Sequence, residues 1–508
     1  MSQVPVLIPT LLLLASLLSL LVGLKSRRGA HLLALAGMVG AFSASVAGLR
    51  SVVATGEPLR YAMGNWLPPI GIEFVMDSLA AYMVTLITFV GLAALIYAPR
   101  SLAREARGKE GMAYPAMALV VAGLTGMCLT GDVFNLYVFL EISALAAYAL
   151  LSIGDRGGPV AVFRYLIIGA VGGGFYLLGV AYLYFSTGTL NMADLAVRLP
   201  ELVESRAIIA AAALMVIGLA VKMALFPFHF WLPDVYTSSP SAVTVLIAPI
   251  MTKVSAYAII RLFLDVFPPG YFTTTLPIAS TIGWVSAAGI LYGSILAIGQ
   301  QDIRRMLAYS SVGQLGYIGL GIGLANPIGM IGGLLHILNH ALMKALLFMV
   351  AGAVRLQHGT TRIPEFVGVG RAMPWTMVGM VIAVLAMVGI PPTAGFFSKV
   401  YLMIGAVQAD AWVWFAVIII SSLLSAIYFF RMVEFVFRDV EDAERSADDS
   451  ATGGVSADEL RDAVAGEVPP SMFIPIAILS AAVILVGVFN FLIVRALLEP
   501  AVAPLLGG

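Results

Sequence analysis

The chain has 508 residues, of which 60% are hydrophobic and only 11% are charged, and its mean hydropathy is +0.99. A soluble domain could not bury so much apolar surface, so the composition predicts a polytopic membrane protein. The 28 basic and 28 acidic residues cancel, and nothing in this balance suggests binding to nucleic acid.

Fourteen segments are apolar enough to cross a membrane, given that a span needs about 20 apolar residues. The first lacks a basic start and a clear cleavage site, so we expect a retained helix and not a removed signal. The predicted fold class is an all-α polytopic membrane protein with about 14 transmembrane helices. The segments are residues 4–24, 31–53, 73–97, 113–130, 132–152, 162–187, 207–230, 241–264, 274–299, 304–325, 328–355, 374–407, 411–437 and 471–495.

The loop charges predict an orientation, because cytoplasmic loops are enriched in Lys and Arg. With this span assignment, eighteen loop Lys and Arg residues fall on one side of the membrane and six on the other. We expect the richer side to be cytoplasmic, which places both termini outside a multi-pass protein of the cytoplasmic (inner) membrane of the cell. This alternation requires an even number of spans.

One polar segment interrupts the apolar pattern. Residues 438–470 contain ten carboxylates and three arginines and few aromatic side chains. Such a composition is typical of a flexible or partly helical cytoplasmic loop. A docking element for a partner is the alternative interpretation.

Four lysines fall inside apolar spans, although the chain has only six. They are Lys222, Lys253, Lys344 and Lys399. A charge in mid-membrane costs at least ~3 kcal/mol, and desolvated lysine, unlike arginine, can exchange a proton near neutral pH. We therefore predict that these lysines move protons. The alternative is that the lysines reach the membrane surface or bridge helices. This explanation would have to apply separately to each of the four lysines.

Glu141 is the acid that we expect deep in an apolar span. A lone buried carboxylate would protonate, whereas pairing with a lysine keeps it ionised. We predict Lys222 as the partner, in a pair whose opening and closing changes the proton affinity of the lysine. A static pair that only joins two helices is the alternative.

The stretch HILNHALMKALLF places His336, His340 and Lys344 at intervals of four. On a helix such residues form a slanting stripe over about 12 Å, which could relay a proton with intervening waters. Metal binding is the rival interpretation, but two histidines supply only two ligands. The single cysteine, Cys128, allows neither an intrachain disulfide nor a cysteine metal site. We expect no metal and no cofactor.

Two spans carry helix breakers beside a lysine. Pro227 follows Lys222 by five residues, and Gly389, Pro391, Pro392 and Gly395 precede Lys399. We predict broken helices, with water satisfying the freed backbone groups. Kinks that only improve packing are the alternative.

The two breaks lie five spans apart, which predicts an inverted repeat of the kind found in transporters. The expected divisions are residues 1–112 (helices 1–3), 113–264 (helices 4–8, the first repeat), 274–437 (helices 9–13, the second repeat), 438–470 (the acidic loop) and 471–508 (the last helix).

Other polar residues are candidates for a proton inlet from the cytoplasm. Ser310, Ser311 and Gln314 could line an entry route, and His229 lies near the cytoplasmic end of its span. For His229, a plain interfacial position is the favoured interpretation. His31 and His358 are expected at the surface.

Four stretches together resemble one family: KMALFPFHFWLPDVYTSSPSAVTVLIAPIMTKVSAY, AYSSVGQLGYIGLGI, HILNHALMKALLFMVAG and GIPPTAGFFSK. They resemble the proton-conducting antiporter-like subunits of respiratory complex I, membrane-bound hydrogenases and Mrp-type cation/proton antiporters. The length and the sequence motifs look most like those of the D-type subunit of Mrp antiporters. The resemblance implies fourteen spans with an inverted repeat, and it implies that the functional residues are Glu141, Lys222, Lys253, His336, His340, Lys344 and Lys399.

The expected function is proton translocation within a multisubunit Na+/H+ antiporter, with other subunits, the lipid bilayer, protons and Na+ as partners. The chain is then an ion-transporter subunit and no enzyme by itself. The alternative is a proton-pumping subunit of complex I or of a membrane-bound hydrogenase. A solute transporter and a structural scaffold are further alternatives. The absence of mid-span arginine argues against the solute transporter, and the presence of the four lysines argues against the scaffold.

Overall fold

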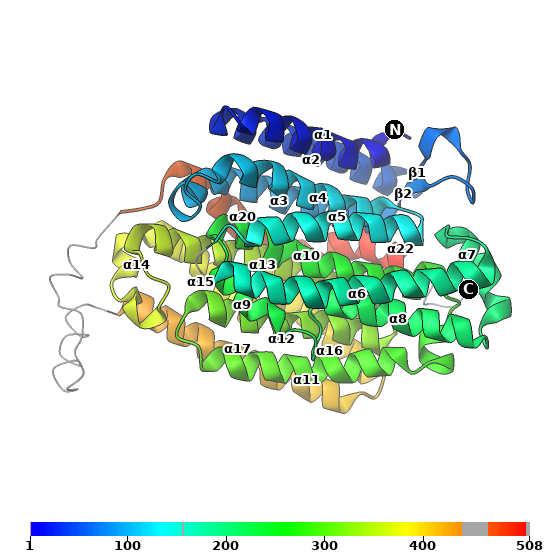
Figure 1. The fold of residues 1–508 in the computed structure, drawn as a ribbon. Helices are drawn as coiled ribbons and strands as arrows, with labels where there is room; N and C mark the ends of the chain where they lie inside the picture. The colour runs from blue at the N-terminus through cyan, green and yellow to red at the C-terminus, as the bar shows by residue number, and fades with distance from the viewer. Residues whose placement is uncertain (1, 155–156, 439–465, 504–508) are drawn as a thin grey trace.

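The computed structural model describes residues 2–154, 157–438 and 466–503, and it is a bundle of helices that run along one long axis (Figure 1). Twelve helices of this described part are long and apolar enough to cross a membrane. They are α1 (Val4–Gly23), α2 (Arg27–Thr55), α3 (Ser78–Glu105), α4 (Glu110–Leu129), α5 (Val133–Leu151), α6 (Gly158–Thr187), α8 (Arg206–Met223), α10 (Ser241–Arg261) with its π-helical end η3 (Leu262–Val266), α11 (Ile278–Ile298), α13 (Pro327–His358), α17 (Trp412–Phe437) and α20 (Pro470–Val488).

Two of the fourteen expected spans are not among these twelve. Helix α12 (Ile303–Leu324) has 22 residues, but its serines, glycines and glutamine make it less apolar. The expected span 374–407 is divided into α15 (Pro374–Val388) and α16 (Ala394–Gln408), each too short to cross alone. The all-α membrane fold is confirmed, and the count of fourteen stays a prediction.

Short elements fill the connections between these helices or follow the last of them. They are η1 (Met63–Asn65), α7 (Met192–Arg198), η2 (Leu199–Leu202), α9 (Trp231–Ser238), η4 (Tyr271–Thr275), η5 (Ile363–Phe366), α14 (Val369–Ala372), α21 (Asn490–Ile493), η6 (Val494–Leu498) and α22 (Glu499–Val502). The last span, expected to reach residue 495, ends earlier because α20 stops at Val488.

The expected start of the third span was wrong. Residues Glu73–Met76 form strand β2, which pairs antiparallel with β1 (Leu59–Ala62), and α3 begins only at Ser78. The side chain of Asp77 sets this boundary, because its Oδ1 accepts the amide N–H of Ala80 at 2.8 Å. The apolar residues before it are largely buried in an extended conformation, which hydropathy alone does not distinguish from a helix.

The bundle has two distinct ends. We call the end that carries the turns α1–α2 (residues 24–26) and α3–α4 (residues 106–109) the basic end, and the end that carries β1 and β2 the hairpin end. Both termini of the described chain lie at the hairpin end (Figure 1), as an even number of crossings requires. Which end faces the cytoplasm stays a prediction.

Helices α10 and α13 form the centre of the bundle. The apolar stretch of α10 is entirely buried and that of α13 nearly so, whereas α1 and α2 bury only about a third of theirs. In Figure 1, α1 and α2 lie along one edge and α11 and α17 along the opposite edge. Side chains on α10 and α13 are therefore shielded by protein on all sides.

Both predicted helix breaks are confirmed. Helix α8 ends at Met223, directly after Lys222, with Ala224 in the left-handed region (φ 58°). Helix α15 ends at Val388, where Gly389 has φ 92°, and α16 begins only at Ala394. Each break falls in the fourth span of its expected group of five. The symmetry between the two groups, and the boundaries of the expected divisions, stay predictions.

Most of the acidic segment 438–470 lies outside the described residues, so its expected structure is not tested there. Its last part is ordered against the bundle. Gln357 donates from Nε2 to the carbonyls of Gly466 (2.8 Å) and Glu467 (2.9 Å), and Val468 is buried.

An ion pair at the hairpin end joins α3 to α10. The guanidinium of Arg261 donates to both carboxylate oxygens of Asp77, at 2.5 and 2.7 Å, and to Asp265 at 2.6 Å. Burial alone would raise the pKa of Asp77, but the charge of Arg261 and the N–H of Ala80 together hold it below its ordinary value of 3.8.

Replacing Asp77 with Asn should therefore lower the thermal midpoint of the detergent-solubilised protein. Asn keeps the helix cap but loses the charge, a loss of about 1–2 kcal/mol. Because the folded-state pKa of Asp77 is depressed, its contribution is fully present at pH 7 and disappears as pH falls below 3.8. Melting curves from pH 7 to pH 3 measure the difference, and an equal difference at every pH would contradict this assignment.

Candidate functional site

All four lysines predicted inside the membrane are buried in the structure. The exposed fractions are 3% for Lys222 on α8, 1% for Lys253 on α10, 0% for Lys344 on α13 and 4% for Lys399 on α16. They come from four helices whose buried faces meet in the interior. None of them reaches the surface of the bundle, so the alternative of surface-reaching lysines is excluded.

Lys222 has the carboxylate partner that the sequence predicted. Its Nζ lies 3.5 Å from Oε1 of Glu141 on α5 and 3.4 Å from the hydroxyl of Tyr148, about two turns further along α5. Because α8 ends one residue later, the amine lies beside a broken backbone. The indole of Trp231, at the start of α9, closes the break by donating to the carbonyl of Val221 at 3.3 Å.

Glycines on α6 make room for this cluster. A Cβ at Gly173 would lie 2.4 Å from Oε1 of Glu141, and one at Gly169 would lie 2.2 Å from the Tyr148 hydroxyl and 3.6 Å from the Lys222 amine. Real Cβ atoms do not approach other atoms as closely as the first two distances. The glycine face of α6 therefore fixes where the carboxylate and the phenol can lie.

Glu141 is less deeply buried than the sequence predicted. Its side chain is 26% exposed, because it lies at the edge of the face that α5 turns outward, between the exposed residues Val138 and Leu145. The predicted position of Glu141 along the span was correct, but the sequence does not reveal which face of a fully apolar helix is covered by neighbouring helices.

Lys253 lies on the fully buried α10 and bonds only to backbone. Its Nζ donates to the carbonyl of Ala248 at 2.7 Å. Helix α10 packs against α13, the helix that carries the stripe.

The stripe on α13 is completely buried, with His336, His340 and Lys344 each at 0% exposure. The two imidazole rings are stacked with centroids 5.9 Å apart. The lysine amine donates to the carbonyl of Leu307 at 2.8 Å and to the Ser310 hydroxyl at 2.9 Å. The predicted helical stripe is therefore present as a line of side chains.

Helix α12 supplies a second polar line that faces the first. Ser310 binds Lys344, and Oε1 of Gln314 lies 2.9 Å from Nε2 of His336, whose Nδ1 lies 2.9 Å from the hydroxyl of Ser398 on α16. Ser311 instead donates to the carbonyl of Leu307 in its own helix. Two of the three α12 residues expected at an inlet thus contact the buried stripe directly.

Lys399 lies at the second helix break. Its amine donates to the last two carbonyls of α15, Met387 at 3.0 Å and Val388 at 2.9 Å, and to the hydroxyl of Ser422 at 3.1 Å. It also lies 5.3 Å from the ring centre of Tyr317. The negative end of the α15 dipole therefore stabilises this ammonium.

The remaining histidines are buried or half-buried. His229 is buried within the bundle, because the loop after the α8 break stacks it on Phe226 and beside Tyr292, and its expected place at the membrane interface stays a prediction. His31 and His358 are half-buried and not fully at the surface. His31 lies 3.0 Å from the carbonyl of Leu95.

Both ring nitrogens of His340 lack a protein hydrogen-bond partner among the described residues. Buried nitrogens of this kind are normally bonded, so His340 is the member of the stripe that is free to bind a further small polar molecule. Across the described chain, no three His, Cys, Asp or Glu side chains gather in a way that could hold a metal ion.

Sequence reasoning missed the groups that connect the predicted residues. Tyr148 follows Glu141 by seven residues and Tyr317 follows Ser310 by seven, and this spacing places each tyrosine on the same helical face as the predicted residue before it. That signal was available. Gly173, Ser398 and Ser422 gave none, because their importance comes from contacts between helices.

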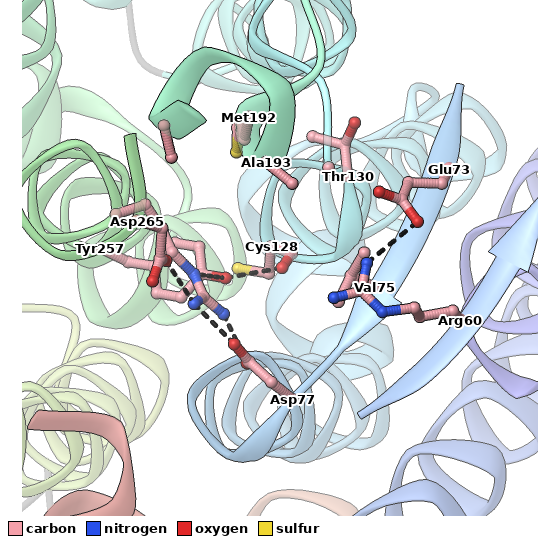
Figure 2. A pocket seen from close by; sticks show the side chains of 13 residues that line it. Arg60, Glu73, Val75, Asp77, Cys128, Thr130, Met192, Ala193, Tyr257 and Asp265 are labelled. Carbon is pink, nitrogen blue, oxygen red and sulfur yellow. Dashed lines mark hydrogen bonds and ion pairs between the residues drawn. The ribbon is translucent and has the colours of Figure 1, made fainter. Parts of the chain in front are cut away.

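A pocket away from these residues lies at the hairpin end (Figure 2). It has a volume of about 340 Å³ and is lined by two paired charge clusters, Arg60 with Glu73 and Arg261 with Asp77 and Asp265. Each guanidinium is paired with at least one carboxylate of the pocket. None of the predicted site residues lines it.

Comparison with known proteins identifies the family. A model of the family described as NADH:quinone oxidoreductase/Mrp antiporter, TM, matches residues 130–425. The chain is 46% identical to the N-type subunit of NADH-quinone oxidoreductase of Desulforudis audaxviator, covering 98% of this chain and 97% of that one. It is 34% identical to the D-type subunit of the Na(+)/H(+) antiporter of Alkalihalophilus pseudofirmus, over 74% and 75% of the two chains.

A solved structure agrees in fold over nearly the whole length. A chain of the Mrp complex from Dietzia superposes with a TM-score of 0.86 at 27% identity, covering 99% of this chain and 97% of that chain. The family model alone spans more than half of the sequence, and the relatives extend the match to both ends. The chain is therefore an antiporter-like membrane subunit that belongs to the NADH:quinone oxidoreductase/Mrp antiporter family.

Proposed function

We propose that this chain carries protons across a membrane as one subunit of a larger complex, along the line of buried residues from Lys222 to Lys399. A proton enters beside the α8 break at Lys222. It passes Lys253 and the stripe of His336, His340 and Lys344, and it reaches the far side by way of Lys399. The basic end faces the cytoplasm in this proposal.

One observation carries the proposal: within the described part of the chain, three of the four buried ammonium groups have no counter-charge. Among the described residues only Lys222 pairs with a carboxylate, whereas Lys253, Lys344 and Lys399 bond to carbonyls and hydroxyls. A buried charge without a counterion is costly. Such a lysine can lose its proton without leaving an unpaired anion behind, which suits a site that is alternately charged and neutral.

The histidines fit the same role. His336 is bonded at both ring nitrogens, so it can accept at one and release at the other. His340, with no protein partner in the described chain, has both nitrogens available to water. Polar and ionisable groups that line up inside a membrane are typical of proton relays.

Glu141 is where we expect the relay to contact another subunit of the complex. A partly exposed carboxylate facing lipid would be unfavourable, so we expect another protein of the complex to cover this face of α5. Movement of Glu141 toward or away from Lys222 then changes how firmly Lys222 holds its proton. The relatives named above are themselves subunits of larger assemblies, which supports a hetero-oligomer.

The first candidate for the complex is a monovalent cation/proton antiporter, which exchanges Na+ for protons. It is supported by the Na(+)/H(+) antiporter relative and by the full-length superposition on a chain of the Mrp complex. The second candidate is a proton pump driven by quinone reduction. The 46% identity over 98% of the chain to a NADH-quinone oxidoreductase relative favours it.

Neutralising the entry lysine should abolish proton movement. Lys222→Met keeps the length of the side chain but cannot carry a proton, so we expect a loss of at least about tenfold in the rate of proton transfer in everted vesicles, followed with a pH-sensitive dye. Lys109→Met, at an exposed lysine, is the matched control and should leave both assembly and transport normal. Normal transport by Lys222→Met would defeat the proposal.

The position of Glu141 can be tested without removing it. In Gly173→Ala the new Cβ must displace the carboxylate, which is the flexible end of its side chain, so the fold should survive. We expect proton transfer to fall about tenfold, because small displacements of reacting groups commonly have effects of this size or more. Gly174→Ala meets no atom within 4 Å and should transport normally. Equal rates in the two variants would contradict a positional role for Glu141.

The two candidate complexes give opposite results in one assay. If the chain belongs to a cation antiporter, adding Na+ to energised everted vesicles should collapse the pH gradient in wild type and not in Lys222→Met. If it belongs to a redox pump, NADH and quinone should drive acidification that Lys222→Met abolishes, with no response to Na+. Absence of both responses in wild type would refute both assignments.

A further inference from the structure

We infer that Glu467, the last carboxylate of the acidic segment 438–470, is a positioning residue for Lys399. The inference rests on the proposed function and adds a means of control from the basic end of the bundle. It starts from the two ends of helix α15, each of which is held by a charged side chain from elsewhere in the chain.

At its first turn, α15 is capped by Glu467. One carboxylate oxygen accepts the N–H groups of Trp375 at 2.6 Å and Thr376 at 3.1 Å, and the other accepts the Thr376 hydroxyl at 2.6 Å. The first turn of a helix leaves N–H groups without partners, and an anion there is favourable. Glu467 supplies both the acceptors and the charge.

Glu467 itself is held in place on both sides. Gln357, near the end of α13, binds the carbonyls of residues 466 and 467. Val468 is buried in the core, and α20 begins two residues after it. The carboxylate therefore stands at a fixed position relative to α13, the helix that carries the His336–Lys344 stripe.

At its other end, α15 presents the carbonyls of Met387 and Val388 to the Lys399 amine. The break at residues 389–393 interrupts the helical hydrogen bonding between α15 and α16. The axial position of α15 is consequently set by side-chain packing and by its two charged ends. A shift of α15 would move the two carbonyls away from the ammonium that they stabilise.

Losing the negative charge of Glu467 should therefore weaken the stabilisation of protonated Lys399. The site would then release its proton at lower pH, and the pH profile of proton transfer should shift toward lower pH by about 0.5 unit. A residue that served only to stabilise the fold would change the amount of complex and leave the profile where it is.

The test compares Glu467→Gln with Glu467→Asp and with Glu459→Gln in everted vesicles that contain the whole complex. Glu459→Gln removes the same charge from the same acidic segment. We expect the shift in Glu467→Gln, return toward the wild-type profile in Glu467→Asp and no shift in Glu459→Gln. An unshifted profile in Glu467→Gln, or an equal shift in Glu459→Gln, would overturn the inference.

Two further variants cover the other outcomes. If Glu467→Gln does not assemble, Thr376→Val removes one of the three bonds and should give a smaller shift in the same direction, and no shift there would also overturn the inference. Lys399→Met separates the two proposals. Normal transport in Lys399→Met refutes the proposed function, whereas an inactive Lys399→Met with an unshifted Glu467→Gln refutes only the role of Glu467.

Discussion

Everything in this structure depends on keeping ammonium groups inside an apolar bundle. A buried lysine needs oxygen atoms around it, and an intact helix offers few because its carbonyls are already bonded. The chain meets this need in three ways. It breaks the span beside Lys399, which frees the last carbonyls of α15, and it lines the interior with the hydroxyls of Ser310, Ser422 and Tyr148. Lys253 and Lys344 also share carbonyls of the unbroken helices α10 and α12.

The same arrangement explains why the lysines differ. Lys222 has a carboxylate partner at the edge of the bundle, so its charge responds to whatever covers that edge. Lys399 lies at the negative end of a short helix whose opposite end is capped from the acidic segment. In the described chain, Lys253 and Lys344 bond to neutral oxygens only. Charged groups near Lys222 and Lys399 can alter the proton affinity at the two ends of the path, whereas Lys253 and Lys344 have only neutral partners in the described chain. Such a path is suited to control from both ends.

The sequence was sufficient to predict the membrane class, the burial of the four lysines, the Glu141–Lys222 pair and both breaks. These features follow from residue chemistry in a window of a few residues, such as a proline five positions after a lysine. The sequence was insufficient for features that depend on contacts between helices far apart in the chain. The exposure of Glu141, the glycine face of α6 and the α12 residues that face α13 arise from packing. Hydropathy also mistook β2 for the start of a helix.

The proposed function requires the buried lysines and histidines to form one hydrated path. The most direct measurement is an experimental structure of the intact complex in lipid, at a resolution that shows ordered water. We expect water molecules that bridge Lys222, Lys253, His340, Lys344 and Lys399 in a continuous line. Apolar packing that separates these side chains, with no water between them, would contradict the proposed function.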